Sequence, residues 1–208
     1  MRFFTSDQHF GHKNIIEYSK RPFESVAQME LAILTRFNDA VSENDDVYHL
    51  GDVSLDEHLV AGLMAKMRGR HHLVAGNHDA CHPCHRRHAR AERLYRDAGF
   101  ATVQTALTFD IEGFGRVDLC HFPYRGDHTS QERYTELRPV DEGHFLIHGH
   151  VHEAWRTRGR MLNVGVDVHD FRPLSEPQVA GLLREMAVHV GKGAGKRHTR
   201  GSGMLGGS

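Results

Sequence analysis

The chain has 208 residues, a length typical of one domain, and a formal charge of −1 from 26 basic against 27 acidic side chains. This near-neutral balance gives no electrostatic basis for binding long nucleic acids, and no apolar run reaches the roughly 18 residues that a membrane span needs. The three cysteines are an odd number, and the first residues turn polar too early for a signal peptide, so we expect a reduced, cytoplasmic protein. The 19 histidines are unusual and direct attention to metal binding and proton transfer.

The first half of the sequence alternates between predicted strands and helices. Residues 1–6, 46–51 and 71–76 are short apolar segments that end at polar or glycine residues, as strands do. Apolar residues recur every four positions from Met29 to Val41, which predicts an amphipathic helix after a capping box at Ser25–Gln28. A second capping box at Ser54–Glu57 predicts another helix, and a third helix is expected over 86–98, ending at Gly99.

From residue 100 onward, strands predominate. Two strands flank a hairpin-length turn at 112–115, two more are expected at 144–148 and 161–164, and a last helix is expected over 175–186. This order favours a layered α/β fold with a mixed sheet system. We assign residues 1–188 to one domain and expect 189–208, which are rich in glycine and basic residues, to form a disordered tail.

Polar clusters follow five of the predicted strands, and strand ends are where an open sheet brings side chains together. The spacing of two residues in Asp7-x-His9 and His150-x-His152 places both side chains of each pair on one face of an extended segment. The seven nitrogen and oxygen donors exceed the four ligands of a tetrahedral zinc ion, and with one shared carboxylate they suit two metals. The donors are the carboxylates of Asp7 and Asp52, the imidazoles of His9, His121, His150 and His152, and the amide of Asn77.

The order Asp-x-His, Gly-Asp, Gly-Asn-His-Asp, His and Gly-His-x-His across residues 7–152 resembles the calcineurin-like metallophosphoesterase superfamily. Segments Asp7–Ile16 and Arg21–Phe23 are similar to a small, single-domain bacterial and phage branch of it. The resemblance covers most of residues 1–185 and implies a four-layer α-β-β-α sandwich with the metals at the sheet edge.

The resemblance also implies a role for each motif residue. Asp52 would bridge two divalent cations, with Mn favoured and Fe, Zn, Co or Ni as alternatives. His78 matches the family's catalytic histidine, which is not a metal ligand. The first cation would be held by Asp7, His9 and His152, and the second by Asn77, His121 and His150.

The implied reaction is hydrolysis of phosphate monoesters or diesters. A hydroxide that bridges the two metals would attack phosphorus, and His78 would protonate the leaving group or stabilise the transition state. A small phosphodiester or nucleotide is favoured because no capping domain or nucleic-acid module is visible, although a phosphatase or a small nuclease acting on nucleic acid stays open. The alternative from another class is a non-catalytic, metal-bound scaffold of the same fold, which is disfavoured because no ligand is missing. No membrane partner is expected, and the oligomeric state is left open.

Other polar residues have a structural interpretation beside the functional one. Cys81–His85 resembles a zinc knuckle, but its ligands are compressed around Pro83, so an incidental loop is favoured. Cys120 is expected to be buried and inert, and Asp79 to cap or brace the following helix rather than touch substrate. The stripe of Arg86, Arg90 and Arg93 is interpreted as a solvated helix face rather than a phosphate grip. Further residues near the motifs are candidates for substrate contact, each with a structural role as the default: His12, Arg21, Tyr124, Arg125, His128 and Trp155.

Overall fold

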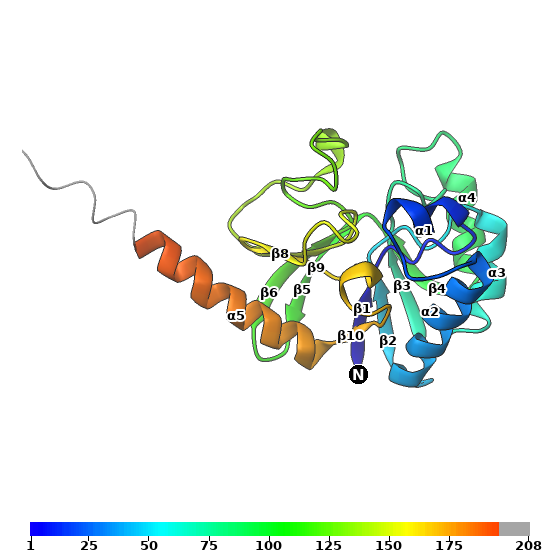
Figure 1. Cartoon of the computed structure of the whole chain (residues 1–208), viewed down its shortest axis with the longest axis horizontal. Coiled ribbons are helices and arrows are strands. Elements are labelled where there is room, and N and C mark those ends of the chain that lie inside the picture. The colour runs from blue at the N-terminus through cyan, green and yellow to red at the C-terminus, as the bar shows by residue number, and fades with distance from the viewer. Residues whose placement is uncertain (196–208) are drawn as a thin grey trace, which may run out of the picture.

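The computed structural model describes the backbone of residues 1–195 and the side chains of residues 1–191, and it contains two five-stranded sheets in this range (Figure 1). The first sheet has the order β10-β1-β2-β3-β4, in which β1 to β4 are parallel and β10 is antiparallel to β1. Its strands are β1 Arg2–Thr5, β2 Asp46–His49, β3 Arg70–Val74, β4 Phe100–Gln104 and β10 Leu174–Ser175.

The second sheet has the order β5-β6-β7-β9-β8. Strands β6, β7 and β9 are parallel, whereas β5 and β8 run antiparallel to their neighbours. The hairpin between β5 and β6 lies where the turn at 112–115 predicts it. The strands are β5 Ala106–Ile111, β6 Gly115–Cys120, β7 Phe145–His148, β8 Thr157–Arg158 and β9 Met161–Asn163.

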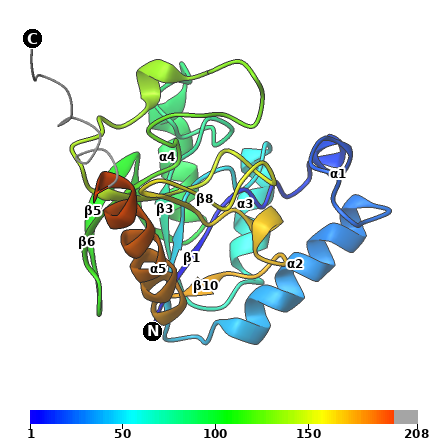
Figure 2. The ribbon, with the colours of Figure 1, turned by 60° about the vertical axis from the view of Figure 1, so that its left-hand side comes forward.

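Helices cover the outer sides of the paired sheets. The four helices α1 Lys13–Tyr18, α2 Val26–Ala40, α3 Glu57–Met64 and α4 His88–Asp97 lie beside the first sheet (Figure 1). Helix α5, Glu176–Gly195, runs past β10 and β5 on the other side (Figure 2). Two mixed sheets flanked by helices confirm the four-layer α-β-β-α sandwich that the resemblance implies. Two short 3₁₀ helices, Thr135–Leu137 and Val166–Val168, lie in connecting segments.

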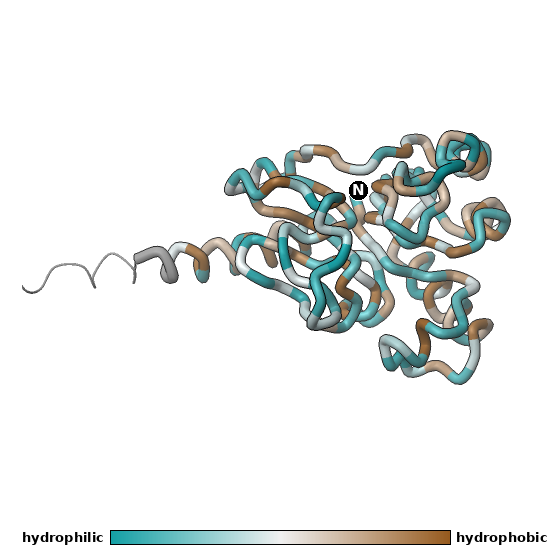
Figure 3. The backbone as a smooth tube through the Cα atoms, turned by 90° about the horizontal axis from the view of Figure 1, so that it is seen from above, coloured by the Kyte–Doolittle hydropathy of each residue, from teal (hydrophilic) through white to brown (hydrophobic). Residues whose placement is uncertain are grey.

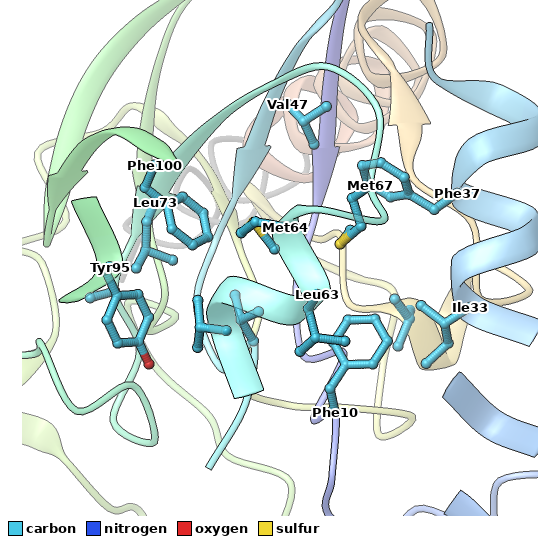
Figure 4. Packing of buried hydrophobic residues seen from close by; sticks show 14 of the residues in the cluster. Phe10, Ile33, Phe37, Val47, Leu63, Met64, Met67, Leu73, Tyr95 and Phe100 are labelled. Atoms are coloured by element: carbon cyan, nitrogen blue, oxygen red, sulfur yellow. The ribbon is translucent and has the colours of Figure 1, made fainter. Parts of the chain in front are cut away.

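Two apolar clusters hold these layers together. Between the helices and the first sheet, Ile33 and Phe37 of α2 and Leu63 of α3 point toward Phe10 and the sheet (Figure 4). Between the sheets, Phe4 packs in one cluster with residues of β6, β7, β9 and α5. Because the two clusters lie on opposite faces of the first sheet, its central strands are buried on both faces, as parallel strands usually are.

The amphipathic pattern predicts α2 correctly. Its N-cap residue is Ser25, whose hydroxyl accepts a hydrogen bond from the N–H of Gln28 at 3.2 Å. Met29, Ile33 and Phe37 are buried. Helix α4 begins at His88, two residues after the predicted start, and it ends before Gly99, which adopts a φ of +115°.

The second predicted capping box is wrong. Helix α3 is capped by Asp56, whose carboxylate accepts the N–H of His58 at 2.9 Å. Ser54 is engaged elsewhere, because its hydroxyl donates to the carbonyl of Phe10 at 3.0 Å and so joins the segments after β1 and β2.

The last helix is longer than the pattern predicts. We expected it to end at Met186, but α5 continues to Gly195. Residues 189–195, assigned above to the disordered tail, are therefore helical, and the remainder of that prediction concerns 196–208, outside the described residues. The buried apolar residues of α5 lie between Val179 and Met186, and among the described side chains none after Met186 is buried.

Hydrophobic and hydrophilic stretches alternate along the backbone tube (Figure 3). Within the part of the chain that the structure describes, no helix is both long enough and apolar enough to span a bilayer.

Candidate metal centre

The seven candidate ligands follow strands of both sheets. Asp7, Asp52 and Asn77 come after the parallel strands β1, β2 and β3, whereas His121 follows β6, and His150 and His152 follow β7. The segments are tied by backbone bonds, since the Asp7 N–H donates to the Gly51 carbonyl and the Gly149 N–H to the His121 carbonyl, both at 3.0 Å. The carboxyl ends of the strands therefore meet at one edge, as the strand-end pattern predicts.

The local conformation of the ligands differs from the extended segments that their spacing suggested. Asp7 and His9 have φ of +59° and +54°, and His150 and His152 have φ of +72° and +46°. Asp52 shares the left-handed region at +56°. Residues other than glycine adopt this region at an energetic cost and gather at functional sites when surrounding structure holds them there. Tertiary contacts, rather than the alternation of a strand, thus orient both pairs.

Two glycines let the ligand segments approach each other. A Cβ added at Gly76 would overlap Asp52 Oδ1 and lie 2.8 Å from His121 Nδ1. A Cβ added at Gly149 would overlap Ser6 Oγ and Asp7 Oδ2. At both positions the reason for glycine is close approach rather than a turn, because neither has a positive φ.

The ligand atoms lie at distances that suit shared cations. Donor atoms of Asp7, His9 and His152 all lie within 4.8 Å of one another, and so do those of Asp7, Asp52 and His121. Asp52 Oδ2 is 3.5 Å from both His9 Nε2 and His121 Nε2, so this carboxylate lies between the two groups.

Several of these donors are buried without a hydrogen-bond partner. They are His9 Nδ1 and Nε2, His121 Nε2, His150 Nε2 and Asn77 Oδ1. Burying a polar atom without a partner costs about 1–3 kcal/mol, so a cluster of such atoms needs an explanation. Cations would supply the missing partner, because each of these atoms is a metal donor. The residues present therefore fit a pair of bound metal ions.

Hydrogen bonds on the far side of two imidazoles fix their orientation. His121 Nδ1 donates to the Leu50 carbonyl at 2.7 Å, which leaves Nε2 as the unprotonated, metal-binding nitrogen. His152 Nδ1 lies 3.3 Å from Asp167 Oδ2, and Asp167 pairs with Arg21 at 2.7 Å. Arg21 also donates to the Asp7 carbonyl at 2.7 Å and so links the segment after β1 to the segment after β7.

Comparison with known proteins agrees with this geometry. The family model for the calcineurin-like phosphoesterase superfamily domain matches residues 3–179. The chain belongs to this superfamily. Its curated relatives include the gene 66 proteins of mycobacterium phages D29 and L5, both 34% identical, over 91% and 90% of this chain and 97% and 96% of theirs.

More distant relatives share the whole domain. An uncharacterized protein of Methanocaldococcus jannaschii is 24% identical over 89% of this chain and 93% of its own length. Among solved structures, a protein of unknown function from Aquifex aeolicus matches with a TM-score of 0.67 and 28% identity, over 88% of this chain and 98% of that chain. Each of these relatives is covered over more than nine-tenths of its own length, so all are similar in size to this chain.

Burial shifts the pKa values of the candidate ligands so that the uncharged form of each is favoured. It raises the pKa of Asp7 and Asp52 and lowers that of His9, His121 and, to about 3, His150. A bound cation would favour ionised carboxylates and neutral imidazoles. It would therefore lower the raised pKa values of the aspartates, and it is compatible with the lowered pKa values of the histidines. His152 differs: burial lowers its pKa, but the hydrogen bond to Asp167 and the negative charges of Asp7 and Asp167 together outweigh burial and leave the pKa raised.

Asp79 has the bracing role that the sequence suggested, although not for the following helix. Its carboxylate accepts the backbone N–H groups of Asp52 and Gly76 at 2.8 Å and that of Val53 at 3.0 Å. It therefore ties together the segments that carry Asp52 and Asn77, and it is fully buried rather than available to substrate.

Five of the seven candidate ligands line a cavity of about 340 Å³: His9, Asp52, Asn77, His150 and His152. His78 lies on its wall, and the backbone N–H of His78 donates to Asp52 Oδ1 at 2.9 Å. Burial and the neighbouring His152 lower the pKa of His78. Two of the candidates for substrate contact, His12 and His128, line the cavity. Residues that the sequence did not single out line it too, among them Tyr18, Leu55, Arg133 and Tyr134.

Two carboxylates near the centre were missed by the sequence analysis. Asp167 follows β9, so the rule that chemistry gathers at strand ends would have found it. Asp127 lies 3.5 Å from His150 Nε2 in the long connection between β6 and β7, where no sequence signal marks it. Its carboxylate accepts the N–H groups of His128 at 2.7 Å and Arg133 at 3.1 Å, so it organises the segment above the cavity.

The remaining candidates have structural positions. Cys81 is buried and Cys84 exposed, and among the described residues neither belongs to a group whose donor atoms could share a metal ion. This favours the incidental loop over the zinc knuckle. Cys120 is buried as expected, and burial raises its pKa to about 11. Arg21 is buried against Asp167, and Trp155 packs against His148.

Proposed function

We propose that this protein uses two divalent cations to hydrolyse small phosphodiesters or nucleotides, and that Mn is the favoured metal. The observation that carries the proposal is the set of unpartnered, buried nitrogen and oxygen atoms near the buried carboxylates of Asp7 and Asp52, beside a cavity that five of the candidate ligands line. A non-catalytic scaffold would have no need for both a complete donor set and an accessible His78 beside it.

The proposed metal ligands form two groups that share Asp52. Bound cations supply an activated water as nucleophile and neutralise charge on the phosphoryl oxygens. Asp52 lies between His9 and His121, which supports its role as the shared ligand. In this assignment Asp7, His9 and His152 hold one cation, and Asn77, His121 and His150 hold the other.

His78 acts on the leaving group. Its ring faces the cavity, and its backbone bond to Asp52 fixes it next to the shared ligand without using either ring nitrogen. A phosphoryl group in the cavity would raise the pKa of His78, because opposite charges favour each other, and would load the ring with a proton. The protonated ring then donates that proton to the departing oxygen.

The walls of the cavity support an organic ester rather than inorganic phosphate alone. Tyr18 is 67% exposed and Leu55 44% exposed at its rim, so a base or aryl group would find apolar surface there. Arg133 also lines the cavity. Its guanidinium pairs with Asp127 Oδ1 at 3.2 Å, and its Nε, which has no hydrogen-bond partner, would donate to the phosphate.

Metal removal tests the proposal directly. Chelator-treated protein is expected to lose hydrolysis of bis(p-nitrophenyl) phosphate and to regain it with Mn²⁺, at two ions per chain by elemental analysis. Asp52→Ala is expected to abolish both turnover and full metal loading, while Asp170→Ala, which alters an exposed carboxylate, retains both. Hydrolysis that persists after verified removal of metal would contradict the proposal.

The role of His78 is tested by leaving groups. His78→Ala should retain both metals and lose about 10²–10⁴-fold in turnover of an alkyl ester, the usual contribution of a positioned acid. The loss should be smaller for a nitrophenyl ester, whose oxygen departs without full protonation. Equal losses for both esters would assign electrostatic stabilisation rather than proton donation to His78.

A further inference from the structure

A second cavity adjoins the metal centre. It has a volume of about 350 Å³, and Leu55 and His78 line both cavities. The rest of its wall comes from the start of α3 and from the segment that leads into α4, including Glu57, His85 and Arg87. A ligand bound at the metals can therefore extend past His78 into this second space.

The second cavity is basic. Arg87 and Arg90 line it, are exposed, and have no carboxylate within 4.0 Å among the residues that the structure describes. By contrast, Arg96 farther along α4 is paired with Glu92. Glu57 is the acidic residue of the wall, so the two guanidinium groups leave a net positive charge there.

The spacing of the two arginines suits one anion. Arg87 is the N-cap residue of α4, and Arg90 lies three positions later, so both side chains project from the same face of the first turn. That turn has no acidic residue, so no side-chain charge within it opposes an anion, although the N–H groups of His88 and Arg90 donate to the carbonyls of His85 and Arg87. Guanidinium groups bind phosphate through paired hydrogen bonds, which makes phosphate the anion of best fit.

We propose that this basic cavity binds a second phosphate of the substrate, carried on the leaving group. The inference rests on the proposed function, in which His78 protonates the leaving group and thus marks the side of the metal centre from which that group departs. The preferred substrate is a phosphodiester whose leaving group bears a further phosphate, either as the terminal phosphate of a short nucleotide or as the next backbone phosphate of an oligonucleotide.

A pair of substrates and a pair of variants test this inference. Thymidine dinucleotide is compared with the same dinucleotide phosphorylated at both ends, so that whichever nucleoside leaves carries a phosphate. For the Mn²⁺-loaded wild type, kcat/KM should be at least tenfold higher on the phosphorylated form. Arg87→Ala/Arg90→Ala should lose most of that preference, and Arg86→Ala/Arg93→Ala, which removes the same charge from exposed positions outside the cavity, should keep it.

The outcomes separate this inference from the proposed function. Two results would contradict phosphate binding in the basic cavity while leaving the proposed hydrolytic activity standing. One is a wild type that hydrolyses both dinucleotides without preference, and the other is an equal loss of preference in the two double variants. If no ester is hydrolysed, calorimetric binding of the phosphorylated dinucleotide to the Mn²⁺-loaded variants decides: tenfold weaker binding for Arg87→Ala/Arg90→Ala alone supports the cavity, and equal binding refutes it. A longer oligothymidylate distinguishes a terminal phosphate from a backbone phosphate, since only the latter gives the preference without end phosphorylation.

Discussion

Replacing Asp167 with asparagine should weaken one metal site and lower the stability of the chain. The carboxylate of Asp167 is 2% exposed and pairs with Arg21, whose side chain is fully buried, through contacts of 2.7 and 2.9 Å. The same carboxylate contacts His152 Nδ1 at 3.3 Å. Asparagine is uncharged and has one acceptor oxygen in place of two, so in either orientation its NH₂ group faces an N–H of Arg21. Asp167→Asn therefore leaves a buried guanidinium without its counter-charge.

The magnitude follows from these contacts. Removing one partner of a buried ion pair costs about 3–5 kcal/mol. Arg21 keeps its bonds to the carbonyls of Asp7 and Gln8, at 2.7 and 2.9 Å, so we expect the lower end of that range. For a chain of this length about 3 kcal/mol corresponds to a fall in Tm of roughly 6–12 °C. The bond that orients His152 loses its charged acceptor, which should weaken binding of the first metal ion about 10–100-fold.

Calorimetric melting of chelator-treated protein measures the first effect, and titration with Mn²⁺ against a competing chelator measures the second. The titration should show one weakened site and one unchanged site. Asp170→Asn is the matched control, because Asp170 is 69% exposed and pairs only with partly exposed arginines. Wild-type Tm and wild-type affinity at both sites in Asp167→Asn would refute the reasoning that this ion pair positions His152.

Three further predictions concern other parts of the molecule. Gly149→Ala should lose metal binding, because the added Cβ overlaps Asp7 and Ser6, whereas Gly181→Ala, with open space around it in α5, should leave Mn²⁺ titrations unchanged. Burial lowers the pKa of His49 well below its usual value, so the unfolded chain binds more protons below pH 6.5 and stability must fall as the pH falls. Between pH 7.5 and 5.5, the free energy of unfolding of chelator-treated protein, measured with urea, should fall by about 1.4 kcal/mol less in His49→Gln than in wild type. Equal falls in the two proteins would exclude His49 as a contributor. A chain of residues 1–188 should melt within about 2 °C of the full chain, because the buried residues of α5 end at Met186, and a larger fall would show that 189–208 contribute to the domain.

The local sequence determined much of the fold. The four-residue apolar period from Met29 to Val41 and the cap at Ser25 are short-range features, so α2 could be predicted without knowing its neighbours. The end of α5 could not be predicted in this way. The residues after Met186 carry no apolar stripe, so a helix that continues beyond the core leaves no pattern in the sequence. Ser54 shows the same limit: its sequence resembles a cap, but a contact with Phe10, distant in the chain, competes for its hydroxyl.

The candidate metal centre divides in the same way. The sequence shows which residues offer nitrogen and oxygen donors and that they follow predicted strands, because strand propensity and ligand chemistry are local properties. Their arrangement is decided by tertiary contacts: Asp7 and His150 are held in left-handed conformations that no spacing rule predicts, and glycine at Gly149 is required by Asp7, 142 residues earlier in the chain. The pairing of Arg21 with Asp167 and the basic cavity beside His78 likewise exist only where separate segments meet, because charge compensation and enclosed volume are properties of the packed molecule.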